Sequence, residues 1–142
     1  MGGSYAREQH QVPTFFHSFL GMSEAAATSP DVSSVLAALQ ALYHNPDAQA
    51  KQQANQALLQ FQKTPQAWST ANTLLLAQDV PLESRLFSAQ TFRSKVTFDL
   101  EQLEGASQEQ LRDTLLHALD MYATGPRVIQ TQLCLALAAL AL

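Results

Sequence analysis

Apolar residues recur along the chain at intervals of three and four positions, which is the spacing of one face of an α-helix. Two clear runs cover positions 32–43 and 50–61, and the turn Asn45-Pro46-Asp47 separates them. Asp47 can cap the second of these helices, because its side chain can accept a first-turn N–H. Four more runs follow, and the pattern therefore predicts six helices: 30–43, 48–63, 65–75, 81–96, 107–122 and 126–142.

Helix-start signals stand between these runs at regular places. A Ser or Thr cap accepts an N–H that has no partner in the helix, and Pro at the first helical position loses no hydrogen bond. Ser107 with Gln110 fits a capping box, and Gly125 suits the end of the preceding helix. The signals are Ser29-Pro30, Thr64-Pro65, Asp79-Val80-Pro81, Ser107 to Gln110, and Gly125-Pro126.

The helices pair into three hairpins, at about 29–63, 64–98 and 107–142. Their starts are about 35 and 43 residues apart, which lies between the ~34 residues of tetratricopeptide repeats and the ~40–47 of HEAT repeats. The Trp, Leu-Gly and Tyr consensus of tetratricopeptide repeats is missing from the hairpins, so HEAT-type repeats are favoured. The sequence predicts an all-α fold, an α-solenoid of about three HEAT-type hairpins.

The last predicted helix is apolar on every face from Leu133 to Leu142. Such a helix needs cover on all sides, and in a solenoid the next repeat supplies it. We therefore expect an array truncated at its C-terminus, with further repeats missing after Leu142. Cys134 lies within this apolar run, and we expect it to be a buried structural thiol.

Residues 1–28 differ in character from the hairpins. The stretch from Met1 to Gly21 has neither the basic start nor the unbroken apolar core of a signal peptide. We expect residues 1–28 to be a disordered or non-native leader, in which Met1 to Gly21 are either an upstream extension of the reading frame or foreign sequence.

Composition narrows the possible functions. A net charge of -4 and a pI near 5.4 argue against a nucleic-acid surface, and the longest apolar stretch is about half of the ~20 residues that a membrane span needs. A single cysteine rules out an intrachain disulfide and favours a reducing compartment.

Motifs for catalysis are missing from the sequence. The five glycines form no phosphate-binding loop, and the four histidines have no metal-ligand spacing. Asp99, Glu101 and Glu104 suit a solvated linker better than a paired-carboxylate site. We predict a protein that is no enzyme, with no catalytic residue, no cofactor and no metal.

The stretch from Lys51 to Val96 carries a recognisable pattern. It consists of Ala54 with Leu58, then Gln60 to Trp68, then Leu74-Leu75, and then Phe87 to Val96. In order and spacing it resembles the importin-β N-terminal domain. Two further pieces are similar to the transportin-SR branch of that family: 37–43 with Pro46-Asp47, and Thr131 to Ala138. Ser88 and Phe92 depart from the usual Ala and Leu of the family.

This resemblance implies the N-terminal, Ran-GTP-binding region of a nuclear transport receptor, with the second helix of each hairpin on the concave face. The implied partners are Ran in its GTP form, nucleoporins and, through later repeats, protein cargo such as Ser/Arg-rich splicing factors. The implied location is nucleus and cytoplasm, with shuttling between them. The alternative is an α-solenoid scaffold unrelated to Ran. The expected exposed partner-binding residues are Lys51, Gln52, Asn55, Gln90, Arg93, Ser94 and Lys95.

Overall fold

The computed structural model describes residues 30–142, and this part of the chain is helical. Its elements are α2 (Pro30–His44), α3 (Ala48–Gln62), α4 (Gln66–Leu76), α5 (Leu82–Phe98), the short 3-10 helix η3 (Leu100–Gln102), α6 (Gly105–Met121) and α7 (Arg127–Ala141). The predicted all-α fold is confirmed. Residues 1–28, for which we expect a leader, lie outside the described part.

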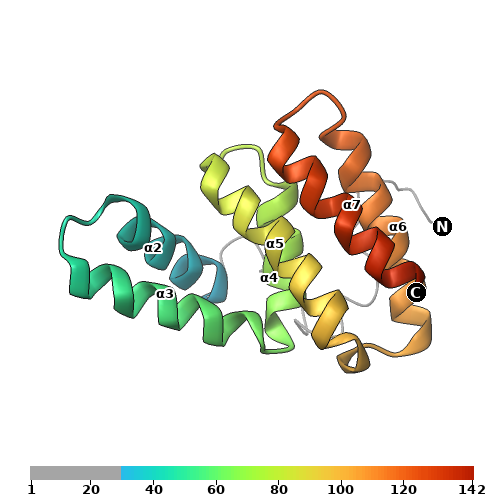
Figure 1. Cartoon of the computed structure of the whole chain (residues 1–142), viewed down its shortest axis with the longest axis horizontal. Helices are drawn as coiled ribbons and strands as arrows, with labels where there is room; N and C mark the ends of the chain where they lie inside the picture. Colours follow the sequence, from blue (N-terminus) through green and yellow to red (C-terminus); the bar gives the residue numbers. More distant parts are fainter. Residues whose placement is uncertain (1–29) are drawn as a thin grey trace.

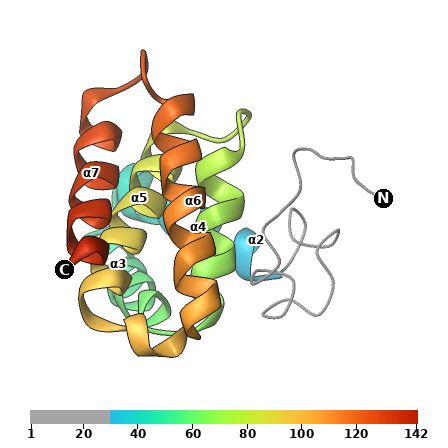
Figure 2. The ribbon, with the colours of Figure 1, turned by 90° about the vertical axis from the view of Figure 1, so that its right-hand side faces the viewer.

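The helices form three antiparallel hairpins stacked in two layers. α3, α5 and α7 form the near layer in Figure 1, while α2, α4 and α6 lie behind them. The view from the side shows the same division, with α7 and α5 on one side and α6, α4 and α2 on the other (Figure 2). This is the arrangement of a HEAT-type α-solenoid.

Two hydrophobic clusters hold the stack together. The larger one is built by α4, α5, α6 and α7 around Trp68, Phe92 and Leu115, all of them fully buried. The smaller one belongs to the first hairpin, and it reaches the second hairpin through Leu74 of α4 and Phe87 of α5. The first hairpin is therefore joined to the rest of the protein by a narrower apolar contact than the one that joins the second and third hairpins.

The start of α3 follows the sequence signal. Asp47 precedes the helix in extended conformation, and its Oδ1 accepts the backbone N–H of Gln49 at 3.2 Å. The cap predicted from Asn45-Pro46-Asp47 is thus confirmed.

Two other start signals are used differently from the prediction. The capping box at Ser107 is wrong, since α6 begins at Gly105 with Glu104 at the N-cap and no side-chain cap bond. Gln108 explains the difference, because its side-chain amide turns back to the carbonyls of Leu100 and Leu103. Thr64 does not cap α4 either, since its hydroxyl donates back to the Phe61 carbonyl at 2.7 Å.

The last helix is buried on one side and exposed on the other. α7 buries Ile129, Leu133 and Ala136, while Cys134 and Leu135 are exposed. The expected burial of Cys134 is therefore wrong. The reason is geometric, because α7 packs through one side against α5 and α6, and Cys134 lies on the other side of the helix.

Within residues 30–142 no helix is long and apolar enough to cross a membrane. In the same part of the chain, no three His, Cys, Asp or Glu side chains lie together as metal ligands.

Candidate partner-binding face

The side chains expected to bind a partner come from α3 and α5, which lie in the same layer (Figure 1). On α3, Lys51, Gln52 and Asn55 are all exposed. Residues separated by three and four positions share one side of a helix, so these three present a continuous polar surface.

On α5 the exposed stripe contains Gln90 and Arg93, with Ser94 partly exposed beside them. The Arg93 Nη1 donates to Gln132 Oε1 of α7 at 3.3 Å. This bond links α5 to α7 on the exposed side of the layer and holds the guanidinium near the surface. We name the exposed side chains of α3, α5 and α7 the near-layer face.

Lys95 does not belong to this face. We expected it to be exposed, and this expectation is wrong, because its side chain is 0% exposed. Phe92 and Val96, its neighbours on α5, are buried in the large cluster, and the end of α3 covers the Lys95 side chain. A direct contact between Lys95 and a partner is therefore excluded by its burial.

The buried ammonium of Lys95 binds the turn between α3 and α4. Its Nζ donates to the carbonyl oxygens of Thr64 at 2.7 Å and Gln62 at 3.1 Å, and to Gln102 Oε1 at 2.9 Å. The Asp99 carboxylate lies 3.3 Å away, and the centroid of the Trp68 ring lies 5.0 Å away. A buried charge is tolerated when its donors are satisfied in this way.

This arrangement also terminates α3. The last carbonyls of a helix have no intrahelical partner, and a cation at that end interacts favourably with the helix dipole. Burial lowers the pKa of Lys95, while the charges of Asp99 and Glu101 partly oppose that shift. Lys95 thus adds from α5 a donor for the Gln62 carbonyl, beside the backbone cap in which the Lys63 N–H donates to the Gln60 carbonyl.

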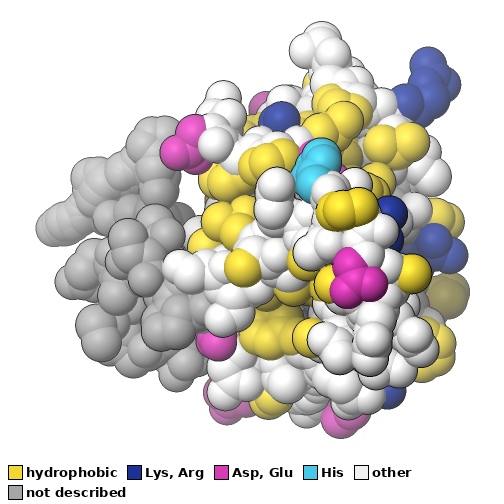
Figure 3. Space-filling model, turned by 90° about the vertical axis from the view of Figure 1, so that its left-hand side faces the viewer, with side chains coloured by type: hydrophobic (Ala, Val, Ile, Leu, Met, Phe, Trp, Pro, Cys, Tyr) yellow, Lys and Arg dark blue, Asp and Glu magenta, His cyan; other side chains and the backbone are white. Residues whose placement is uncertain are grey.

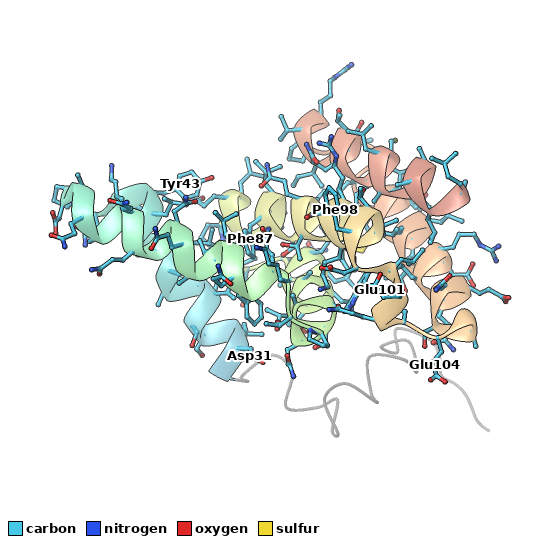
Figure 4. All side chains as sticks on the ribbon, turned by 60° about the horizontal axis from the view of Figure 1, so that its bottom comes forward. Asp31, Tyr43, Phe87, Phe98, Glu101 and Glu104 are labelled. Carbon is cyan, nitrogen blue, oxygen red and sulfur yellow. The ribbon has the colours of Figure 1, made fainter. Side chains whose placement is uncertain are left out.

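Four residues of α5, spaced four apart, contact the first hairpin. Glu83 pairs with His44 of α2 at 3.0 Å, and Phe87 packs into the small cluster (Figure 4). Thr91 Oγ1 accepts the Gln62 side-chain N–H at 2.8 Å, and Lys95 binds the end of α3. Because residues at this spacing share one side of a helix, they form a single strip along α5. We name Glu83, Phe87, Thr91 and Lys95 the seam.

The residues that sequence reasoning missed are those that complete this seam. Gln102 accepts from both Lys95 and the Trp68 indole N–H, which it meets at 3.0 Å, and it donates to the Lys63 carbonyl. The four-residue spacing from Glu83 to Lys95 is visible in the sequence. Gln102 gives no such signal, because it lies in the short connection between α5 and α6.

Comparison with known families bears on what this stack of helices is. Residues 54–120 match the family model of the importin-beta N-terminal domain. The match begins in the middle of α3, runs through the seam and ends in the last turn of α6. The importin-beta N-terminal domain therefore includes Trp68, Lys95 and Gln102, the residues that join the first two hairpins.

The chain belongs to the importin-beta family, because curated relatives are more than 30% identical to it over more than two thirds of its length. The chain is 40% identical to Transportin MOS14 of Arabidopsis thaliana over 109 residues, which is 77% of this chain and 11% of that protein. It is 41% identical to the mRNA transport regulator MTR10 of Saccharomyces cerevisiae over 114 residues, or 78% of this chain and 11% of the relative. It is 34% identical to Importin-13 of Homo sapiens over 122 residues, or 86% of this chain and 13% of the relative. The chain thus spans between a tenth and a seventh of the length of these relatives.

Proposed function

We propose that this chain is the N-terminal part of a nuclear transport receptor of the transportin-SR branch, and that its near-layer face binds Ran in the GTP form. The observation that carries the proposal is the importin-beta N-terminal domain match over residues 54–120. The names of the relatives, a transportin, an importin and an mRNA transport regulator, agree with a role in transport. Such a protein works by binding and catalyses no reaction.

Ran contacts in this proposal come from both exposed groups on the face. α3 contributes Lys51, Gln52 and Asn55, and α5 contributes Gln90 and Arg93, with Ser94 at the edge. In interfaces of this kind a few side chains supply most of the binding free energy. Among the residues named here, Arg93 is expected to contribute most, because Arg is enriched at binding hot spots. Lys95 acts from beneath the face, by holding the end of α3 against α5.

The wider partners follow from the same proposal. Nucleoporins and protein cargo, including Ser/Arg-rich proteins, would bind through repeats other than the three described here. A receptor of this type shuttles between nucleus and cytoplasm.

The test is nucleotide-dependent binding. Ran loaded with a non-hydrolysable GTP analogue should be retained on the immobilised chain, and Ran loaded with GDP should not. Arg93→Ala should weaken binding, with a roughly fivefold higher Kd for Ran, which is equivalent to about 1 kcal/mol of binding free energy. Arg112→Ala, an exposed change on α6 in the far layer, is the matched control and should bind as wild type. Equal retention of both nucleotide forms, or of neither, would contradict the proposal.

A further inference from the structure

The two ends of the seam are built differently. At one end, the Lys95 ammonium is completely buried and holds two backbone carbonyls at the end of α3. At the other end, Glu83 and His44 meet at the surface, with side chains that are 26% and 54% exposed. The two ends are 12 positions apart on α5, which is about 18 Å along a helix axis.

Side chains are packed less completely at the His44–Glu83 end of the seam than at the Lys95 end. A pocket of about 240 Å³, partly open to solvent, lies beside Glu83, between α2 and the connection that leads into α5. It is lined mainly by Leu36, Leu39, Val80 and Pro81. Seen from the side of the first hairpin, hydrophobic side chains reach the surface of the protein (Figure 3). The Lys95 end, in contrast, is covered by Trp68 and Gln102.

We propose that the first hairpin, α2 with α3, is a hinged arm that pivots at the Lys95 end of the seam and opens at the His44–Glu83 end. An exposed ion pair adds little to stability, because water and salt compete for both charges. Breaking the Lys95 end would instead take from a buried ammonium its hydrogen bonds to the carbonyls of Gln62 and Thr64. Opening therefore starts where the bond is exposed and the packing is incomplete.

Figure 1 shows how the arm is placed for such a motion. α3 meets α5 at its C-terminal end and diverges from it toward its N-terminal end. A rotation of about 10° around the Lys95 end would move the start of α3 by roughly 4 Å and position 49 by about 3 Å, given the length of the helix. The arm is held to the second hairpin by the seam and by the small cluster, in which Leu74 and Phe87 pack against α2 and α3. This apolar contact is smaller than the one that joins the second and third hairpins, and it limits the arm to a small rotation.

The hinge has a consequence for binding, and this consequence alone rests on the proposed function. Lys51 and Gln52 lie toward the moving end of α3, while Gln90 and Arg93 lie on α5, beyond the hinge. A partner that touches both groups binds one degree of opening better than others, and so it shifts the population of arm positions.

Distance measurements between spin labels test the hinge in the whole chain. One label is placed on the exposed native Cys134 of α7, which belongs to the other side of the hinge. The second is placed on α3, either at Gln49→Cys near the moving end or at Gln60→Cys near the pivot, both exposed positions. Glu83→Gln breaks the exposed ion pair, and Glu109→Gln on α6 is the matched control.

Glu83→Gln should broaden the distance distribution from Cys134 to position 49 by populating opened positions of the arm, in which this distance differs by up to about 3 Å for a 10° rotation. The distance to position 60 should stay unchanged, and Glu109→Gln should change neither distance. An unchanged distribution at position 49 would overturn the hinge. Equal movement at positions 49 and 60 would also overturn it, because the hairpin would then shift as a whole without a pivot. Neither result depends on whether the chain binds Ran.

Discussion

The ammonium of Lys95 lies 2.7 Å from the carbonyl oxygen of Thr64, across the boundary between two hairpins. Lys95 is in the last turn of α5, and Thr64 is in the turn that starts the second hairpin. Together with the bond to Gln62, the last residue of α3, this bond fixes α5 against the turn between α3 and α4. Neighbouring repeats are therefore connected by a charged hydrogen bond that is closed to water.

Replacing Lys95 with Met should destabilise the protein by about 2–4 kcal/mol, because the carbonyls of Gln62 and Thr64 and the Gln102 side chain would lose a buried donor. Urea denaturation followed by circular dichroism measures the loss. Lys51→Met, the same substitution at an exposed position, should change stability by less than about 0.5 kcal/mol. Similar unfolding midpoints for the two variants would show that the buried ammonium contributes nothing.

Trp68 anchors the large cluster and donates its indole N–H to Gln102 at 3.0 Å. Trp68→Phe keeps an aromatic ring but loses this bond, and it should cost about 1–2 kcal/mol. Trp68→Ala leaves a cavity and should cost about 3–5 kcal/mol. Guanidinium unfolding of both variants checks the order. Equal losses would mean that ring packing is unimportant and that only the hydrogen bond matters.

Tyr122 should make stability fall in alkaline solution. Its hydroxyl donates to the Leu75 carbonyl, and burial raises the pKa of the phenol above 10.0, while the Arg85 guanidinium partly opposes this shift. The unfolded chain loses this proton near pH 10 and the folded chain loses it later, so the contribution is complete below about pH 10 and falls as pH rises through the folded pKa.

The stability difference between wild type and Tyr122→Phe isolates this effect. It should be constant from pH 7 to 9 and should shrink above about pH 10, as measured by urea midpoints at each pH. Lys95 has a lowered pKa and contributes a slope of opposite sign in alkaline solution, but it is present in both proteins and cancels. A difference that grows with pH would contradict the burial of the phenol.

Cys134 should react in the folded protein. Its side chain is exposed on α7, so a thiol reagent such as 5,5′-dithiobis(2-nitrobenzoic acid) should modify one thiol per chain without denaturant. The absorbance of the released product gives both the rate and the stoichiometry. Adding urea should change the extent of reaction little, whereas a buried thiol would react only after unfolding.

Much of the fold could be predicted because its signals are local. The three-and-four spacing of Val32 to Leu42 indicates a helix wherever that segment lies, and Asp47 caps α3 through a group only two residues away. Ser107 shows the limit of such local signals, since a valid capping pattern is overridden when Gln108 binds the carbonyls of the preceding connection.

In the candidate site, too, some side chains could be placed from local sequence and one could not. Gln52, Asn55, Gln90 and Arg93 are exposed as expected, because polar residues opposite an apolar stripe face solvent in almost any packing. Lys95 could not be assigned like this, because its burial depends on where the end of another hairpin docks.

The sequence by itself determined the helices, their pairing into hairpins and the resemblance to the importin-β N-terminal domain, since periodicity and local order are properties of short segments. The tertiary structure alone decided that Lys95 lies under the face and not on it, and that Cys134 lies outside the core. It also decided that Glu83, Phe87, Thr91 and Lys95 meet the first hairpin as one seam. The physical reason is that burial and hydrogen-bond partners depend on contacts between residues up to 47 positions apart, and these exist only once the hairpins have packed.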